Sequence, residues 1–228
     1  MKNIGLVVAL KEEIEQIYPK IGKIVKKYNV CNLEVTEFRN SNKKIFLITS
    51  GIGMVASAIA TELLIAKFGV EIVVNFGIVG ALKKNQHLQN VVAVGELVHY
   101  DFSLDFADES KNGCYPEDRN NPIFVMTDFT KEFIRKFTNL EMVRIACGDK
   151  FINSTALKDR LVAQFNVDIC DMESFAIFKA CEIAKIPLIS IKSVSDMADE
   201  NSNNSFEQIV AQGINCYSNV IESVIKNL

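Results

Sequence analysis

Hydrophobic residues in this chain occur in short continuous runs, separated by segments in which they recur at helical spacing. An apolar run of four to eight residues between polar or glycine-containing segments is typical of a buried strand. These runs predict strands at residues 4–9, 72–76, 91–100, 142–147, 168–171 and 187–194. Three shorter consecutive strands are predicted at 23–30, 33–39 and 44–49, and their short connections favour antiparallel pairing. Helical spacing predicts helices at 11–17, 55–68, 127–137, 154–165, 172–185 and 205–228.

Strands that alternate with helices predict an α/β fold with a central mixed sheet covered on both faces. With 228 residues, we expect one domain, spanning 1–228. Residues 101–121 are polar and lack a period, which predicts a long loop. No G-x-G-x-x-G motif opens a helix after the first strand, so the dinucleotide-binding pattern is absent.

Charge and composition exclude several classes of function. The net charge of −3 gives no argument for binding to nucleic acid or to an anionic membrane surface. No apolar run reaches the roughly 18 residues of a membrane span, and the first residues lack a signal-peptide cleavage site, so we expect a cytoplasmic protein. The six cysteines are scattered, which fits free thiols in a reducing compartment. With only two histidines, we expect neither a metal nor a cofactor.

Acidic residues follow three of the predicted strands. Glu12 and Glu13 follow the first strand, Asp171 and Glu173 flank Met172, and Asp196 follows the last strand. The carboxyl ends of strands in an α/β sheet are where ligands bind, so these acids could share one pocket. Two such acids suit the cleavage of a glycosidic bond, which needs a proton donor and a base for water.

Each of these acids also has a structural interpretation. Glu12 and Glu13 could be the solvated start of a helix, and Glu173 could be a first-turn acid. Asp196 could cap a following helix. The residues alone leave these alternatives open.

Six segments together resemble one family. The chain is similar to the nucleoside phosphorylase and nucleosidase superfamily, and specifically to the 5′-methylthioadenosine/S-adenosylhomocysteine nucleosidases. The segments are collinear with the family pattern across almost the whole chain and lie at residues 5–13, 50–56, 75–80, 148–153, 171–174 and 195–199. The resemblance implies a three-layer sandwich whose central mixed sheet is partly barrel-like and flanked by helices. It also implies hydrolysis of 5′-substituted adenine nucleosides.

The resemblance assigns one group of residues to the purine. Asp196 resembles the acid that protonates purine N7, and Ser195 resembles its support on the leaving-group side. Phe151 resembles the ring that stacks on the base, and the backbone of Ile152 resembles the group that reads the base edge. Phe206 is expected to cover the base.

A second group is assigned to the sugar and its 5′ substituent. Glu13 resembles the carboxylate that deprotonates the attacking water, and Glu173 resembles the acceptor of the ribose hydroxyls. Met172 resembles the residue that packs on the sugar, Gly80 lies where the family backbone approaches the ligand, and Ile52 matches a residue of the alkylthio pocket.

Several positions depart from the family pattern. The segment 171–175 has a shorter acid and a bulkier following residue than usual. Ile78 stands where a small hydroxyl residue is usual, and Lys192 stands where an arginine is common. These departures leave the 5′ group and the base open, so adenosine, inosine and a futalosine-type nucleoside stay as alternative substrates.

Two other functions stay open as alternatives. A phosphorylase of the same fold would replace water by phosphate, which needs clamped donors, usually arginines, and the neighbourhood of Glu13 has none. A nucleoside-binding module would not need both Glu13 and Asp196.

Self-association is a further implication of the resemblance. We expect a homodimer, with a hexamer as the alternative, and the helix at 55–68 is a candidate surface. Leu104 or Phe106 of the loop at 101–121 would then enter a neighbouring site. The expected small-molecule partner is a purine nucleoside.

Overall fold

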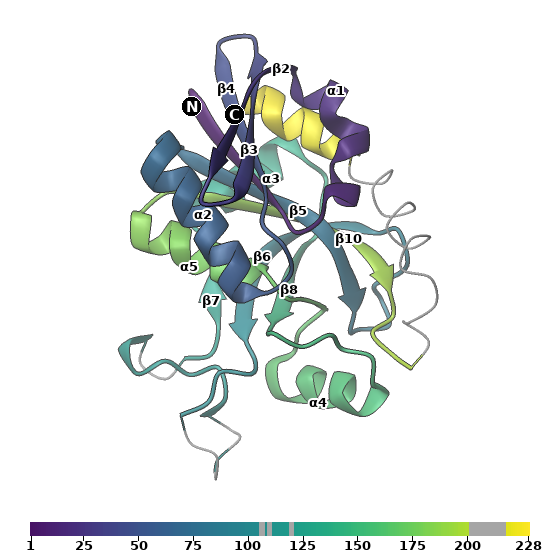
Figure 1. Ribbon diagram of the computed structural model, residues 1–228. Coiled ribbons are helices and arrows are strands. Elements are labelled where there is room, and N and C mark those ends of the chain that lie inside the picture. The colour runs from purple at the N-terminus through teal and green to yellow at the C-terminus, as the bar shows by residue number, and fades with distance from the viewer. Residues whose placement is uncertain (105–107, 109–110, 119–120, 201–217) are drawn as a thin grey trace.

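The computed structural model describes residues 1–104, 108, 111–118, 121–200 and 218–228, and these form a central sheet with helices on both faces (Figure 1). Ten strands make up the sheet: β1 (Asn3–Val8), β2 (Lys23–Val30), β3 (Leu33–Asn40), β4 (Lys43–Thr49), β5 (Ile72–Ala81), β6 (Val91–His99), β7 (Phe124–Val125), β8 (Met142–Cys147), β9 (Ile169–Asp171) and β10 (Leu188–Asp196). The helices are α1 (Tyr18–Ile21), α2 (Met54–Phe68), α3 (Asp128–Phe137), α4 (Thr155–Phe165) and α5 (Ser174–Ala184), with a last helix described over 218–227.

Five of the strands close on themselves. The pairing runs β5–β10–β6–β8–β9 and returns to β5, which pairs with both β10 and β9. We call these five strands the ring. The remaining path, β5–β1–β4–β3–β2, extends away from the ring as an open sheet, and we call β1 to β4 the arm. The prediction of a mixed, partly barrel-like sheet is therefore confirmed.

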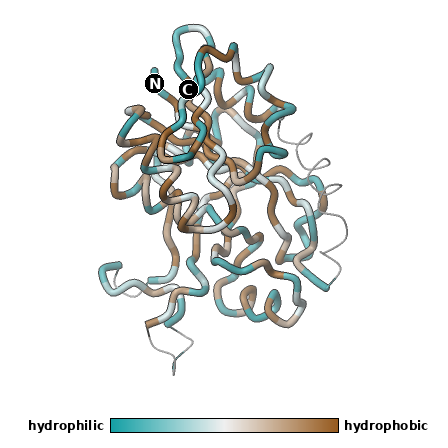
Figure 2. The backbone as a smooth tube through the Cα atoms, in the orientation of Figure 1, coloured by the Kyte–Doolittle hydropathy of each residue, from teal (hydrophilic) through white to brown (hydrophobic). Residues whose placement is uncertain are grey.

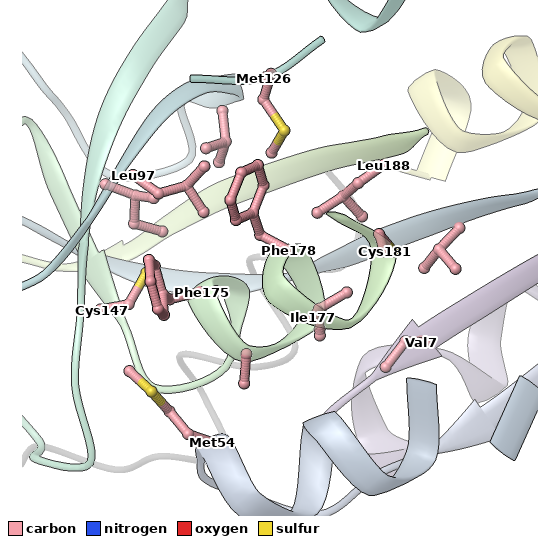
Figure 3. Packing of buried hydrophobic residues seen from close by; sticks show 14 of the residues in the cluster. Val7, Met54, Leu97, Met126, Cys147, Phe175, Ile177, Phe178, Cys181 and Leu188 are labelled. Atoms are coloured by element: carbon pink, nitrogen blue, oxygen red, sulfur yellow. The ribbon is translucent and has the colours of Figure 1, made fainter. Parts of the chain in front are cut away.

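Alternation along the inner strands divides the core into layers. Ile4, Leu6 and Val8 of β1 face one side, where α1, α3 and the last helix contribute apolar residues. Val7 faces the other side, which is covered by α2 and α5 lying side by side. Figure 3 shows residues of α2, α5 and β1 meeting on this second side, and Figure 2 shows hydrophobic residues concentrated along the central strands. Burial on both faces explains why β1 and β5 are nearly continuous apolar runs.

The arm and the ring part from each other in the middle of β5. β1 pairs with β5 only up to Asn75, whereas β10 accompanies β5 as far as Gly80. Asn75 ties the elements at this fork, because its amide donates to Val7 O and its Oδ1 accepts from Ser174 and Ser190. Beyond Asn75, the edge of β5 that faced β1 no longer pairs with β1.

Two predicted strand ends were wrong in the same place. We predicted that β5 ends at Phe76, but the strand continues through Gly77 and Gly80 to Ala81. We also predicted that β10 ends at Val194, whereas it reaches Asp196. The two extensions pair with each other, and ladder hydrogen bonds outweigh the roughly 1 kcal/mol cost of a glycine in a strand.

Other local predictions were also corrected. The helix predicted at 11–17 is two 3₁₀ turns, Lys11–Glu13 and Glu15–Ile17, and Pro19 lies in the short helix that follows. The short strand β7 was not predicted. The beginning of the helix predicted at 205–228 lies outside the described residues.

Two further features of the described residues are the lengths of the apolar helices and the state of the cysteines. In the described part of the chain, no helix is long and apolar enough to cross a membrane. Cys31, Cys114, Cys147, Cys170 and Cys181 are free thiols.

Candidate active site

One cavity opens at the carboxyl ends of β1, β5, β9 and β10, beside the fork. It measures about 760 Å³ when counted out to its open mouth, which is within the usual range for a small-molecule site. Nine of the ten predicted site residues line it, namely Glu13, Ile52, Gly80, Phe151, Ile152, Met172, Glu173, Ser195 and Asp196. The tenth, Phe206, lies outside the described residues. Glu12, by contrast, is exposed and does not line the cavity.

Glu13 occupies the fork between the arm and the ring. Its Oε2 accepts from Leu10 N at 2.9 Å, and its Oε1 accepts from Ile78 N at 3.1 Å. Ile78 N lies on the part of β5 beyond its pairing with β1, so the carboxylate takes the place of the missing strand. A Cβ at Gly77 would lie 2.8 Å from Glu13 Oε1, which explains the glycine. Burial raises the pKa of Glu13, and these two backbone donors partly oppose the shift.

Glu173 caps the N-terminus of α2 from a distant part of the chain. Gly53 N donates to Glu173 Oε1 at 2.8 Å, 120 residues away in sequence. Burial and the charge of Asp171 raise the pKa of Glu173 to about 7. Near neutral pH, its carboxyl therefore exists in both protonation states, and both forms can accept a ribose hydroxyl.

Asp171 lines the cavity and is paired with a buried lysine. Lys192 Nζ lies 2.9 Å from Asp171 Oδ2, and both side chains are at most 3% exposed. Burial alone would raise the pKa of Asp171, but Lys192 and the hydroxyl of Ser174 lower it. Burial alone would lower the pKa of Lys192, but Asp171 raises it. This buried cation also acts electrostatically on Glu13 and Glu173, so it balances part of the charge of three acids.

Asp196 ends β10 and lines the same cavity. Its Oδ1 accepts from Ala198 N at 2.8 Å, and its Oδ2 accepts from Ser195 Oγ at 2.9 Å. A Cβ at Gly80 would lie 3.1 Å from Asp196 Oδ1, so glycine leaves room for this carboxyl. The local turn at Ala198, where φ is 49°, brings the backbone amide back to the side chain.

The cavity mouth is apolar and open. Ile52 is 57% exposed and Phe151 is 50% exposed, whereas Ile152 is buried at 3%. Such a surface can stack on a flat ring and take an apolar substituent. The geometry therefore offers an acid from the ring, a second acid at the fork, a third acid beside α2 and an aromatic wall.

Sequence reasoning missed two contributors to this site. Lys192 was noted only as a departure, yet it is the buried partner of Asp171. Asp149 was not singled out, although Met54 N donates to its Oδ1 at 2.7 Å, so it also caps α2. Its place after a strand, like that of the other acids, was the available signal. Among the described residues, no cluster of three His, Cys, Asp or Glu side chains could hold a metal ion.

Comparisons with known proteins agree with this geometry. The family model described as "Phosphorylase superfamily" matches residues 3–226. An aminodeoxyfutalosine nucleosidase of Helicobacter pylori is 27% identical over 100% of both chains. A 5′-methylthioadenosine/S-adenosylhomocysteine nucleosidase of Buchnera aphidicola is 29% identical over 99% of this chain and 97% of that one. A solved structure of such a nucleosidase from Helicobacter pylori, with butyl-thio-DADMe-Immucillin-A, has a TM-score of 0.92, 26% identity, and coverage of 100% of this chain and 99% of that chain.

Proposed function

The chain belongs to the phosphorylase superfamily, and from that premise we propose that it is a purine nucleosidase. It hydrolyses the N-glycosidic bond of 5′-substituted adenine nucleosides such as 5′-methylthioadenosine and S-adenosylhomocysteine, releasing adenine and the thioribose. The observation that carries the proposal is that Glu13 and Asp196, distant in sequence, line one cavity.

The ring side of the cavity handles the leaving group. Asp196 gives a proton to purine N7, which lets adenine depart as a neutral base when the C1′–N9 bond breaks. Ser195 holds the carboxyl through its hydrogen bond. Phe151 stacks on the base, and the backbone of Ile152 reads its edge. A positioned general acid contributes on the order of 10²–10⁴ in rate.

The fork side handles the sugar and the water. Positive charge develops on the ribosyl carbon, and the nearby carboxylates stabilise it. Glu13 takes a proton from water as that water attacks C1′. Glu173 accepts the ribose hydroxyls, Met172 packs on the sugar, and Gly80 lets the backbone approach the ligand. Ile52 contacts the 5′ substituent.

Water is favoured over phosphate by the charge of the site. Glu13 and Glu173 would both repel a phosphate, and Lys192 is engaged by Asp171. Among the described residues that line the cavity, the one cation is Lys150, and no arginine is present. A phosphorylase needs a cationic clamp there.

A second candidate substrate is aminodeoxyfutalosine. The Helicobacter pylori relative with full coverage carries the name of a nucleosidase for that compound. The open mouth around Ile52 and Phe151 can admit a larger 5′ group than methylthio.

We also propose that the protein is a homodimer. Along α2, Val55 is 71% exposed and Ile59 is 55% exposed, and both lie close in sequence to Ile52 of the cavity. A neighbouring subunit would bury this surface and narrow the mouth. Light scattering with size-exclusion chromatography distinguishes a dimer from a hexamer, and Val55→Lys should shift the protein toward the monomer.

The decisive experiment is adenine release in phosphate-free buffer. We expect free adenine from 5′-methylthioadenosine, S-adenosylhomocysteine or aminodeoxyfutalosine, with no increase when phosphate is added. Release that requires phosphate would identify a phosphorylase instead. No release from any substrate of the panel, with tight adenine binding, would identify a binding module.

A further inference from the structure

The base-binding segment, residues 148–152, has no regular secondary structure of its own. It carries Phe151 and Ile152 on the wall of the cavity, between the end of β8 and the start of α4. Catalytic geometry needs such a wall to be held within a fraction of an ångström. Contacts from outside the segment must therefore set its position.

Asp149 makes contacts in two directions. Its side chain accepts from Met54 N at 2.7 Å, and its own backbone amide donates to Asp101 Oδ2 at 2.9 Å. It therefore joins the base-binding segment to the start of α2 on one side and to Asp101, the second residue after β6, on the other.

The N-terminus of α2 is shared between two acids. Gly53 has no side chain to cap the helix, and its backbone has a φ of 99°. Glu173 accepts from Gly53 N, and Asp149 accepts from Met54 N, so adjacent amides of one helix end hold both. Because a helix end has a fixed geometry, the base-binding segment is placed relative to the acid proposed for the ribose.

Residues 99–101 support the segment from the other side. His99 Nε2 lies 3.1 Å from Asp101 Oδ1, which leaves Oδ2 aimed at Asp149 N. Tyr100 OH donates to Lys150 O at 3.3 Å. A Cβ at Gly148 would lie 2.6 Å from the Tyr100 ring and 2.7 Å from Asp101 Cγ, so the two segments are in direct contact.

We propose that Asp149 is a positioning residue that sets the distance between the base-binding wall and the ribose-binding acid, with Asp101 as its support. The inference rests on the proposed nucleosidase function. Asp149 acts through Phe151, Ile152 and Glu173, so its loss weakens substrate binding more than it slows proton transfer from Asp196.

The test is the division of the effect between KM and kcat. For Asp149→Ala, we expect KM for 5′-methylthioadenosine to rise about five- to tenfold, as for loss of one hydrogen bond to a charged group, with kcat within about threefold. Asp149→Asn keeps an oxygen acceptor for Met54 N and the backbone donor to Asp101, so it should restore KM to within about twofold. Asp159→Ala, an exposed acid on α4, is the matched control and should leave both constants unchanged.

Asp101 provides an independent second variant. Asp101→Ala should raise KM, and the double variant with Asp149→Ala should cost less than the product of the single effects, because both act on one segment. Melting temperatures identify variants that fail to fold. If Asp149→Ala fails to fold, the KM of Asp149→Asn tests the proposal.

Adenine affinity by calorimetry separates this inference from the proposed function. Asp149→Ala should weaken adenine binding even if the protein proves not to be a nucleosidase. Unchanged KM and adenine affinity in Asp149→Ala would overturn the positioning role. An Asp149→Asn variant as impaired as Asp149→Ala would overturn it as well, since charge rather than the acceptor would then matter.

Discussion

The ring and the arm are built from the same kind of strand, but they supply opposite halves of the site. The ring places Asp196 at the end of β10, whereas Glu13 follows β1 of the arm. β5 belongs to both regions and separates from β1 after Asn75. The candidate cavity therefore depends on the fork, since neither region alone brings the two acids together.

The two regions also differ at their outer boundaries. The ring has no free edge, but the arm ends in β2, which is exposed over most of its length. Lys23, Lys26 and Lys27 lie on that strand, and charged residues on an edge strand oppose pairing with other chains. Strand pairing on both sides therefore fixes the strands of the ring. The lysines on β2 oppose edge-to-edge association at the arm.

Removing the acid of the ring should have the largest effect on activity. Asp196→Asn leaves a side chain of the same size but without the proton for N7, so kcat should fall by on the order of 10²–10⁴. Steady-state kinetics with 5′-methylthioadenosine measure the loss, while adenine affinity should change little. Turnover near that of the wild type would end the assignment of this residue.

Removing the buried cation of the ring should have the largest effect on stability. Lys192→Met leaves Asp171 buried without its partner, which should cost about 3–5 kcal/mol of unfolding free energy. Chemical denaturation measures the difference. Lys83→Met is the matched control, because Lys83 pairs with Asp168 at a more exposed position. Equal losses in the two variants would contradict a special role for the buried pair.

Closing the fork should have an intermediate effect on activity. In Gly77→Ala, the new methyl group meets Glu13 Oε1 at 2.8 Å and displaces the carboxylate from Ile78 N. We expect kcat to fall about 10- to 100-fold, since misplaced catalytic groups are costly. Gly95→Ala on β6 is the control, because its new methyl group would meet Met142 at 3.3 Å. A full rate in Gly77→Ala would show that Glu13 is not held by this contact.

The smallest effect concerns the pH dependence of stability. Because the pKa of Glu173 is about 7 in the folded chain and near 4.5 unfolded, folding takes up a proton between these values. This carboxyl therefore lowers stability as pH rises from about 4.5 to 7, and the penalty is complete above 7. Glu173→Gln should be more stable than the wild type above pH 7, by on the order of 1 kcal/mol, and the gap should close toward pH 4.5. Thermal melts across this range test it, with the exposed Glu12→Gln as control; a gap that widens at low pH would contradict the sign.

Much of the fold could be predicted from hydrophobic runs, because burial on both faces leaves a strong local signal. The order of strands and helices was predicted in this way for β1 to β6, for β8 to β10 and for α2 to α5. Ring closure could not, because it depends on β5 pairing with both β9 and β10. The sequence predicted that β5 ends before its glycines, and only the three-dimensional contacts show that Gly77 and Gly80 make room for Glu13 and Asp196.

The site was predictable where a side chain lies at the end of a strand. Glu13, Glu173 and Asp196 were found by this rule and by family resemblance, and their catalytic roles stay proposals. Asp149 also follows a strand but was missed, because its role depends on a contact with the start of α2, 95 residues away in the sequence. Lys192 was missed for a similar reason, because a lysine in a predicted strand gives no sign that a buried acid lies beside it.

The start of α2 has one more consequence. A free helix N-terminus is a common docking place for phosphate, but here two carboxylates from the same chain already fill it. A nucleotide such as AMP would bring its phosphate to a helix end that is saturated with negative charge. For the proposed nucleosidase, adenine nucleotides would therefore be poor competitors of its substrates.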